Sequence, residues 1–174
     1  MGRVKTLPNF LTLLRILALP FVVVSIIGGH FKLALALFLL CAFTDFLDGF
    51  LARRFKSVSS LGILLDPVAD KLLTSSTLIS LAYVKLCDPY SVVVLVGREE
   101  AVTGMRAIAA SRGLLIPASA GGKLKTVLIM AAVTLLLSGY RKLGEVTLLG
   151  AVTVSLITAA HYFYNFWKLL GDRQ

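Results

Sequence analysis

Long apolar runs separated by short polar breaks dominate this sequence. There are six such runs, and each has close to or more than the roughly 20 residues that an α-helix needs to cross the hydrocarbon core of a bilayer. Glycine, proline and charged residues mark the breaks, for example at Gly28-Gly29 and Asp88-Pro89. The pattern therefore predicts a single all-α, membrane-embedded domain over residues 1–174, with a short interfacial segment over residues 1–8 and transmembrane helices at about 9–28, 31–53, 61–86, 90–112, 122–139 and 145–169.

The composition points to lipid rather than water as the solvent of this chain. Apolar residues make up 57% of the sequence and the mean hydropathy is +0.88, both above the usual range for a soluble domain. With 174 residues in total, six spans leave little chain for a separate soluble domain.

Basic residues are distributed unevenly between the two sides of the predicted membrane domain. Ten lie on the side of both termini and four on the other, namely Arg3, Lys5, Arg53, Arg54, Lys56, Arg112, Lys123, Lys125, Lys168 and Arg173 against Lys32, Lys85, Arg141 and Lys142. Because loops rich in Lys and Arg stay in the cytoplasm, both termini are predicted to be cytoplasmic. Topology and anionic lipid headgroups then account for much of the net charge of +9, so no nucleic-acid partner is expected.

Four aspartates lie near the break between the second and third predicted helices. Asp45 and Asp48 are three residues apart, and Asp66 and Asp70 are four apart, so each pair lies on one helix face. The two helices run in opposite directions and meet on the cytoplasmic side, so we expect the two pairs to converge. The same two faces also carry Gly49, Ala52, Arg53 and Gly62.

Clustered carboxylates in a membrane require a compensating cation, because each acid at a helix centre costs about 2.5–3.5 kcal/mol. Mg²⁺ and Mn²⁺ prefer oxygen ligands and commonly combine carboxylates with substrate phosphates. Two such ions would also stabilise charge on a phosphorus centre during in-line displacement. A single aspartate could equally be a salt-bridge partner, and Gly49 or Ala52 could simply allow close helix packing. Four acids at these spacings favour a divalent metal site that acts on a phosphorylated, lipid-linked substrate.

The pattern of these residues resembles the signature of the CDP-alcohol phosphotransferases. It matches at every fixed position of Asp45-x2-Asp48-Gly49-x2-Ala52-Arg53-x8-Gly62-x3-Asp66-x3-Asp70. The resemblance implies a six-helix membrane fold, usually homodimeric, in which the four aspartates surround two metal ions. It also implies transfer of a phosphatidyl or similar group from a CDP-linked donor to an alcohol, with release of CMP.

The resemblance also implies individual roles for residues of this chain. Asp45, Asp48, Asp66 and Asp70 would bind the metal ions, and Asp70 would in addition deprotonate the acceptor hydroxyl. The CDP-diacylglycerol site would consist of Asn9, Thr12, Asp48, Gly49, Ala52, Arg53 and Gly62. Two alternatives stay open: Arg53 could serve membrane topology, and Asn9, Thr12 and Arg15 could cap and anchor the first helix instead of touching the donor.

Basic residues of the cytoplasmic half suggest where the acceptor alcohol binds. Arg106, near the end of the fourth predicted helix, faces Lys123 and Lys125 at the start of the fifth, while Arg98 lies deeper beside two glutamates. Such a pocket suits an anionic acceptor, because arginine clamps a phosphate with two hydrogen bonds. Arg106 is the leading phosphate ligand, since its position predicts burial. Alternatively, the lysines reach the lipid interface and Arg98 pairs with a neighbouring glutamate.

Shorter motifs resemble one branch of the family, the bacterial phosphatidylglycerophosphate synthases. They are Leu7-Pro8-Asn9-x-Leu11-Thr12-x-Leu14-Arg15, Arg98-Glu99-x6-Arg106 and Gly122-Lys123-x-Lys125-Thr126. This resemblance implies sn-glycerol 3-phosphate as the acceptor, its primary hydroxyl attacking the β-phosphorus, and a location in the bacterial inner membrane with the active site facing the cytoplasm. Relatives that use serine, inositol phosphate or phosphatidylglycerol share the core, so these acceptors remain alternatives.

A cation transporter is the competing function of a different class, because intramembrane acids also mark ion pathways. Transporters spread such acids across the membrane depth or use discontinuous helices in repeated halves. Here all four aspartates lie on one side, which favours the enzyme. Near the end of the last run, Tyr162, Tyr164 and Trp167 predict an interfacial aromatic belt.

Overall fold

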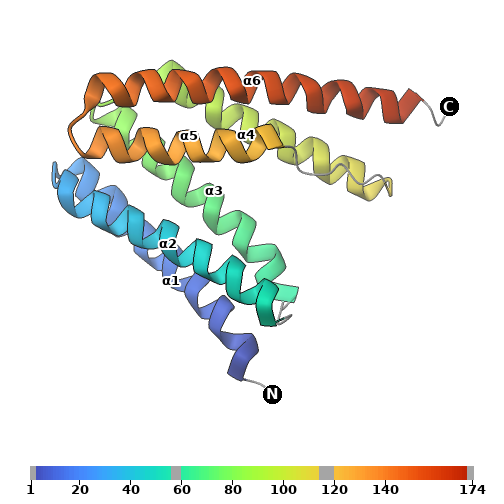
Figure 1. Cartoon of the computed structure of the whole chain (residues 1–174), viewed down its shortest axis with the longest axis horizontal. Helices are drawn as coiled ribbons and strands as arrows, with labels where there is room; N and C mark the ends of the chain where they lie inside the picture. Colours follow the sequence, from blue (N-terminus) through green and yellow to red (C-terminus); the bar gives the residue numbers. More distant parts are fainter. Residues whose placement is uncertain (1–2, 56–59, 114–119, 172–174) are drawn as a thin grey trace. The chain divides into compact units, whose positions relative to one another are not determined.

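A computed structural model describes residues 3–55, 60–113 and 120–171, and the side chains of residues 13–44, 68–113 and 121–167. Over these residues the regular structure is α-helical throughout, which confirms the all-α prediction. The helices agree in order and position with the six apolar runs. They are α1 (Arg3–Ile27), α2 (Phe31–Phe55), α3 (Ser60–Tyr83), α4 (Pro89–Ser111), α5 (Ala120–Leu137) and α6 (Arg141–Gly171) (Figure 1).

Three helix boundaries differ from the prediction. Residues 1–8 were expected as a separate segment, but α1 begins at Arg3 and continues through Pro8 without a break. The third helix ends at Tyr83, because the chain turns at Lys85, whose φ angle is +59°. The last helix begins at Arg141, directly after the turn at Gly139, rather than at residue 145.

Helices α1 to α3 form one compact unit, Met1–Leu86. In this unit α1 packs against both α2 and α3. The contacts bury apolar side chains from all three helices, namely Val22, Ile26, Ala34, Phe38, Cys41, Ala69, Leu73, Leu78 and Leu81. Helix α1 is therefore the central element of the unit that carries the aspartates.

Helices α4 to α6 form a second compact unit, Cys87–Gln174. Here α6 is central, because it packs against both α4 and α5. Between α4 and α6 lies a small core of Val102, Met105, Ala109, Ala159 and Tyr162, with Phe166 packed against it. This unit carries the basic residues of the predicted acceptor pocket.

The C-terminal ends of α1, α3 and α5 share one turn geometry. In each, the third residue beyond the helix donates its backbone N–H to the carbonyl oxygen five residues earlier, and the residue before it has a positive φ angle. Glycine supplies that conformation at Gly29 and Gly139, whereas Lys85 adopts it at the end of α3. Within each unit, these turns let α2 follow α1 and α6 follow α5 after only three residues.

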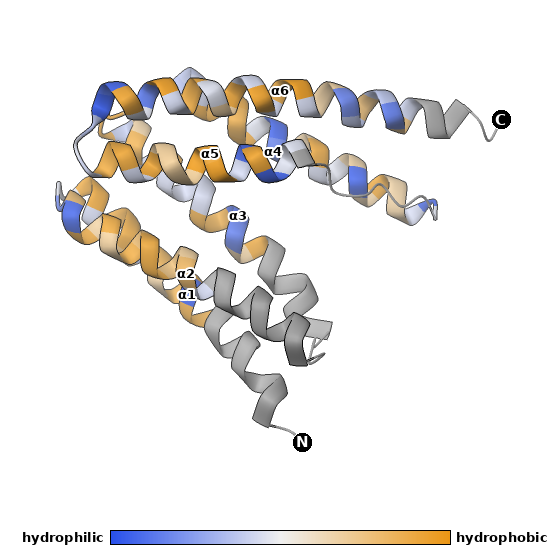
Figure 2. Ribbon diagram, in the orientation of Figure 1, coloured by the Kyte–Doolittle hydropathy of each residue, from blue (hydrophilic) through white to orange (hydrophobic). Residues whose placement is uncertain are grey.

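Large apolar side chains are exposed on every helix with described side chains. On α1, for example, Leu17, Phe21 and Val24 face outward at helical spacing. Figure 2 shows hydrophobic residues along most of the described length of α1, α2, α5 and α6. Among the described residues, one stretch is long and apolar enough by length and composition to cross a membrane, Arg141–Trp167 of α6, with shorter apolar stretches at Leu13–Ile27 and Phe31–Thr44.

Candidate active site

The four aspartates lie in two consecutive helices, as predicted. Asp45 and Asp48 belong to α2, and Asp66 and Asp70 belong to α3. Because both segments are helical, spacings of three and four residues place each pair on one helix face. The side chains of Asp45, Asp48 and Asp66 lie outside the described residues, and that of Asp70 is half-buried within its unit.

The connection between α2 and α3 keeps the two pairs at the same end of the unit. Helix α2 ends at Phe55 and α3 begins at Ser60, so four residues join them. Four residues and their flanking peptide bonds span at most roughly 18 Å, and both helices pack against α1. In Figure 1 the end of α2 and the start of α3 accordingly lie together.

The donor set at this end of the unit suits a hard divalent cation. It consists of carboxylate oxygens alone, which Mg²⁺ and Mn²⁺ prefer, without the cysteine or histidine that softer metals select. Among the described side chains no group of three potential metal ligands occurs, but three of the four aspartates fall outside that part of the chain. A metal site at the aspartates thus fits the residue chemistry and stays a prediction.

The predicted nucleotide-binding residues also lie on helices of the first unit. Asn9 and Thr12 are three residues apart inside α1, and Gly49, Ala52, Arg53 and Gly62 lie on α2 and α3. Their side chains are outside the described residues. The position of Asn9 is nevertheless informative, because it lies well inside α1 rather than at its start. The alternative that Asn9 caps the first helix is therefore wrong.

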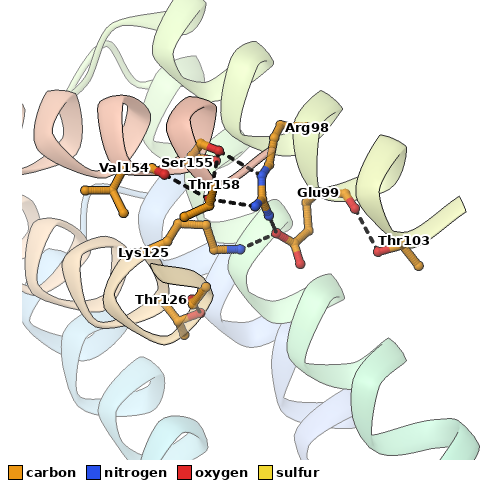
Figure 3. Close-up of polar contacts among 9 residues, drawn as sticks. Arg98, Glu99, Thr103, Lys125, Thr126, Val154, Ser155 and Thr158 are labelled. Carbon is orange, nitrogen blue, oxygen red and sulfur yellow. Dashed lines mark hydrogen bonds and ion pairs between the residues drawn. The ribbon is translucent and has the colours of Figure 1, made fainter. Parts of the chain in front are cut away.

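Arg98 is buried between α4 and α6 and anchored by α6. Its Nε donates to the backbone carbonyl of Ser155 at 3.1 Å, and its Nη2 donates to the hydroxyl of Thr158 at 2.8 Å (Figure 3). The guanidinium carbon also lies 6.0 Å from the ring centre of Tyr162. Three contacts from α6 therefore hold the guanidinium group in place, and its Nη1 lies 3.4 Å from Oε2 of Glu99.

Lys125 brings a second buried cation to the same carboxylate. Its Nζ forms an ion pair with Oε2 of Glu99, the oxygen that Arg98 also contacts. The side chains of Arg98 and Lys125 are only 7% and 9% exposed, and that of Glu99 is 27% exposed. Figure 3 shows the three side chains converging from α4 and α5. The structure thus brings together two of the four predicted acceptor ligands.

The other two predicted acceptor ligands, Arg106 and Lys123, are exposed. For Arg106 this contradicts the burial predicted from its position. The face of α4 that packs against α6 carries Arg98, Val102, Met105 and Ala109 at spacings of four and three. Arg106 follows Met105 by one residue, about 100° around the helix, and so lies off that face. Whether Arg106 binds phosphate stays a prediction.

Three residues of α6 contact Arg98 and complete this site. The sequence pattern did not indicate a role for two of them, Ser155 and Thr158. Ser155, Thr158 and Tyr162 are three and four residues apart, on one face of the helix. The sequence predicts Tyr162 in an interfacial belt, but its side chain is buried at 6% exposure against the Arg98 site. Hydroxyl residues on one face of a long apolar helix are the signal that could have indicated a polar contact there.

Comparison with known proteins gives a consistent result. Residues 5–160 match the family described as CDP-alcohol phosphatidyltransferase. A protein of Rickettsia felis named CDP-diacylglycerol–glycerol-3-phosphate 3-phosphatidyltransferase is 34% identical over 91% of this chain and 94% of its own length. A Bacillus subtilis protein of the same name is 34% identical over 94% and 96% of the two chains. A probable phosphatidylglycerophosphate synthase of Mycobacterium tuberculosis is 36% identical over 98% of this chain and 86% of its own.

Proposed function

Because this chain belongs to the CDP-alcohol phosphatidyltransferase family, we propose that it transfers the phosphatidyl group of CDP-diacylglycerol to sn-glycerol 3-phosphate. The products are phosphatidylglycerophosphate and CMP, so the reaction serves phospholipid biosynthesis. One observation carries the proposal: relatives named for this reaction match the chain over more than nine-tenths of its length.

The aspartates provide the chemistry of the reaction. We assign Asp45, Asp48, Asp66 and Asp70 as ligands of divalent cations, two Mg²⁺ or Mn²⁺ ions by the family resemblance. Bound there, such ions would neutralise the phosphate oxygens of the donor and the charge that develops at phosphorus. The half-buried carboxylate of Asp70 would accept the proton of the acceptor hydroxyl. The new bond joins that oxygen to the β-phosphorus, and the bond to the CMP oxygen breaks.

The remaining residues of the first unit would hold the donor. We assign six further residues to the donor site, namely Asn9 and Thr12 on α1 and Gly49, Ala52, Arg53 and Gly62 on α2 and α3. Glycine at positions 49 and 62 would let the nucleotide approach the helix backbone closely. The Arg53 guanidinium would contribute positive charge toward the diphosphate.

The buried cations of the second unit support an anionic acceptor. Arg98 and Lys125 converge on one carboxylate, which leaves one more positive charge than negative among these three groups. A phosphate monoester would add negative charge beside these groups and accept hydrogen bonds from both cations. Lys123 and Arg106 lie exposed on the same two helices and would attract the acceptor from solvent.

We further propose that all six helices cross the inner membrane of a bacterium, with both termini and the active site in the cytoplasm. Exposed apolar side chains on the helices would face lipid, and the excess of basic residues on one side supports the orientation. Alkaline phosphatase, which is active only outside the cytoplasm, provides the test. A fusion at Tyr140 should be active and a fusion after Gln174 inactive; the reverse pattern would contradict the topology.

A homodimer is the proposed assembly, by the same family resemblance. Chemical cross-linking in native membranes, followed by mass measurement of the detergent-purified protein, tests it. A particle of twice the chain mass of 18.7 kDa is expected after subtraction of bound detergent, and a particle of one chain mass at all concentrations would exclude the dimer.

The decisive experiment measures CMP release by the purified protein in lipid vesicles. With CDP-diacylglycerol, glycerol 3-phosphate and Mg²⁺ or Mn²⁺, the protein should release CMP, and removal of the metal with EDTA should stop the reaction. Serine, inositol phosphate and phosphatidylglycerol serve as alternative acceptors in parallel. Preference for one of them would overturn the assignment of glycerol 3-phosphate as the acceptor. The absence of CMP release with any of these alcohols would overturn the proposed transferase function.

A further inference from the structure

Glu99 lies between the two buried cations of the second unit. Its Oε2 receives hydrogen bonds from Arg98 Nη1 on α4, at 3.4 Å, and from Lys125 Nζ on α5. Its own helix position is reinforced by Thr103, whose hydroxyl donates to the Glu99 carbonyl oxygen at 2.7 Å. One carboxylate oxygen therefore connects two helices and two cations (Figure 3).

The two cations depend on Glu99 to different degrees. Arg98 also contacts Ser155, Thr158 and the Tyr162 ring, so α6 fixes its position even without Glu99. Lys125 has a long flexible side chain, and a buried ammonium group is unfavourable unless an opposite charge accompanies it. Glu99 supplies that charge and draws the Lys125 ammonium to the side of Arg98.

We propose that Glu99 is a positioning residue for the phosphate of the acceptor. It holds Lys125 beside Nη1 of Arg98, so that the phosphate meets two cations already arranged to receive its oxygens. This inference rests on the proposed function, in which these two cations bind glycerol 3-phosphate. Prearranged ligands cost less conformational entropy on binding than flexible ones, so Glu99 contributes to acceptor affinity without contacting the donor.

The substitution Glu99→Gln tests the proposal, because it keeps the size and one acceptor oxygen but removes the charge. Lys125 should then turn toward solvent to recover its hydration. We expect the KM for glycerol 3-phosphate to rise at least about tenfold, in the range for residues that orient binding groups. The KM for CDP-diacylglycerol and kcat at saturating acceptor should change much less. Glu99→Asp, which keeps the charge, should restore part of the affinity.

Two comparisons separate this role from a general structural one. Glu100→Gln removes the same charge from the adjacent, exposed residue of α4 and should leave both KM values unchanged. If Glu99 acts through Lys125, then Lys125→Ala and the double variant Glu99→Gln/Lys125→Ala should have the same KM for glycerol 3-phosphate. A further rise in the double variant would show that Glu99 acts independently of Lys125.

A failure of the role of Glu99 can be distinguished from a failure of the proposed phosphatidyltransferase function. A wild-type protein that releases no CMP with glycerol 3-phosphate overturns both. An active wild type with an unchanged KM in Glu99→Gln overturns the role of Glu99 alone. A lower KM in this variant also overturns it, because it would mean that Glu99 competes with the acceptor for the two cations.

Discussion

The ring of Tyr162 lies against the guanidinium group of Arg98, with 6.0 Å between the guanidinium carbon and the ring centre. Tyr162 is itself part of the core that joins α4 and α6. An aromatic ring attracts a cation that lies over its face, more strongly where water is excluded. The contact therefore connects the packing of the second unit to the position of a proposed substrate ligand.

Tyr162→Leu should weaken acceptor binding more than Tyr162→Phe. The leucine variant loses the aromatic face, whereas the phenylalanine variant retains it. A loss of about 1 kcal/mol from the cation–π contact corresponds to roughly a fivefold rise in the KM for glycerol 3-phosphate. Steady-state kinetics on both variants provide the measurement. Equal KM values in the two variants would exclude a contribution of the ring to Arg98.

Asp70→Asn should lower kcat by about 10²–10⁴-fold, the usual contribution of a general base. Donor binding should change less, because the other three aspartates would still hold metal. Turnover is measured by CMP release, and donor affinity by equilibrium binding of CDP-diacylglycerol. Asp88→Asn is the matched control, since Asp88 caps α4 by accepting from the Ser91 N–H at 2.9 Å. If both quantities fall equally in Asp70→Asn, Asp70 serves mainly as a metal ligand.

Gly144→Ala should destabilise the α5–α6 hairpin. A Cβ atom at Gly144 would lie 2.6 Å from Cγ and 2.8 Å from Cδ2 of Leu136, and 3.1 Å from the backbone nitrogen of that residue. Backbone and Cγ cannot move aside as a side-chain tip can, so overpacking of about 1–3 kcal/mol is expected. Thermal unfolding in detergent measures the change.

Gly150→Ala is the matched control for that variant. Gly150 lies in the same helix, but apart from its two chain neighbours and the adjacent helix backbone no atom lies within 4 Å of where a Cβ at this position would be. Because alanine favours helix by up to about 1 kcal/mol over glycine, this variant should be equally or more stable. A similar loss in both variants would mean that close packing against Leu136 is not the cause.

Lys85→Gly should stabilise the protein. Lys85 has a φ angle of +59° at the end of α3, a conformation that costs a residue with a side chain about 1–2 kcal/mol. The greater freedom of glycine in the unfolded chain offsets part of the gain, about 0.4–1 kcal/mol. A net gain of about 1 kcal/mol would raise Tm by about 2–4 °C. Gly139 occupies the corresponding turn position after α5, with a φ angle of +88°. Gly139→Ala introduces a side chain there and should lower Tm.

Cys87 should be unreactive toward alkylating reagents near neutral pH. Burial in the turn before α4, with Asp88 and Glu145 nearby, raises the pKa of its thiol from 9.0 to about 11. At pH 8 the thiolate fraction is then about one in a thousand. Labelling with N-ethylmaleimide in a Cys41→Ala background, followed by mass spectrometry, measures this. Complete labelling within minutes at pH 8 in the folded protein would contradict it.

The raised pKa of Cys87 also determines the direction in which the free energy of unfolding changes with pH. A pKa raised in the folded state favours the neutral thiol there, so the folded protein holds its proton to higher pH than the unfolded chain does. The stabilising contribution is complete below pH 9 and is lost as the pH rises from about 9 to about 11. In Cys87→Ala this part of the alkaline loss of stability should be absent when Tm is measured across that range.

The sequence by itself determined the helical framework and the chemistry of the first unit. Apolar runs and their breaks predict the six helices, since length and turn residues are local properties. The spacing of Asp45, Asp48, Asp66 and Asp70 follows from helix periodicity alone, and the same pattern identifies the family. None of this depends on how the helices pack.

Only the tertiary structure decided which charged residues are buried and what they contact. Arg98 and Lys125 meet at Glu99, Arg106 is exposed, and Tyr162 lies in the core rather than at an interface. Charged residues of α4 lie on more than one face of the helix, so the sequence pattern alone gives little signal for which face packs inward. The sequence therefore does not show whether the face of Met105 or that of Arg106 packs inward, and the contacts of α4 with α6 decide that it is the face of Met105.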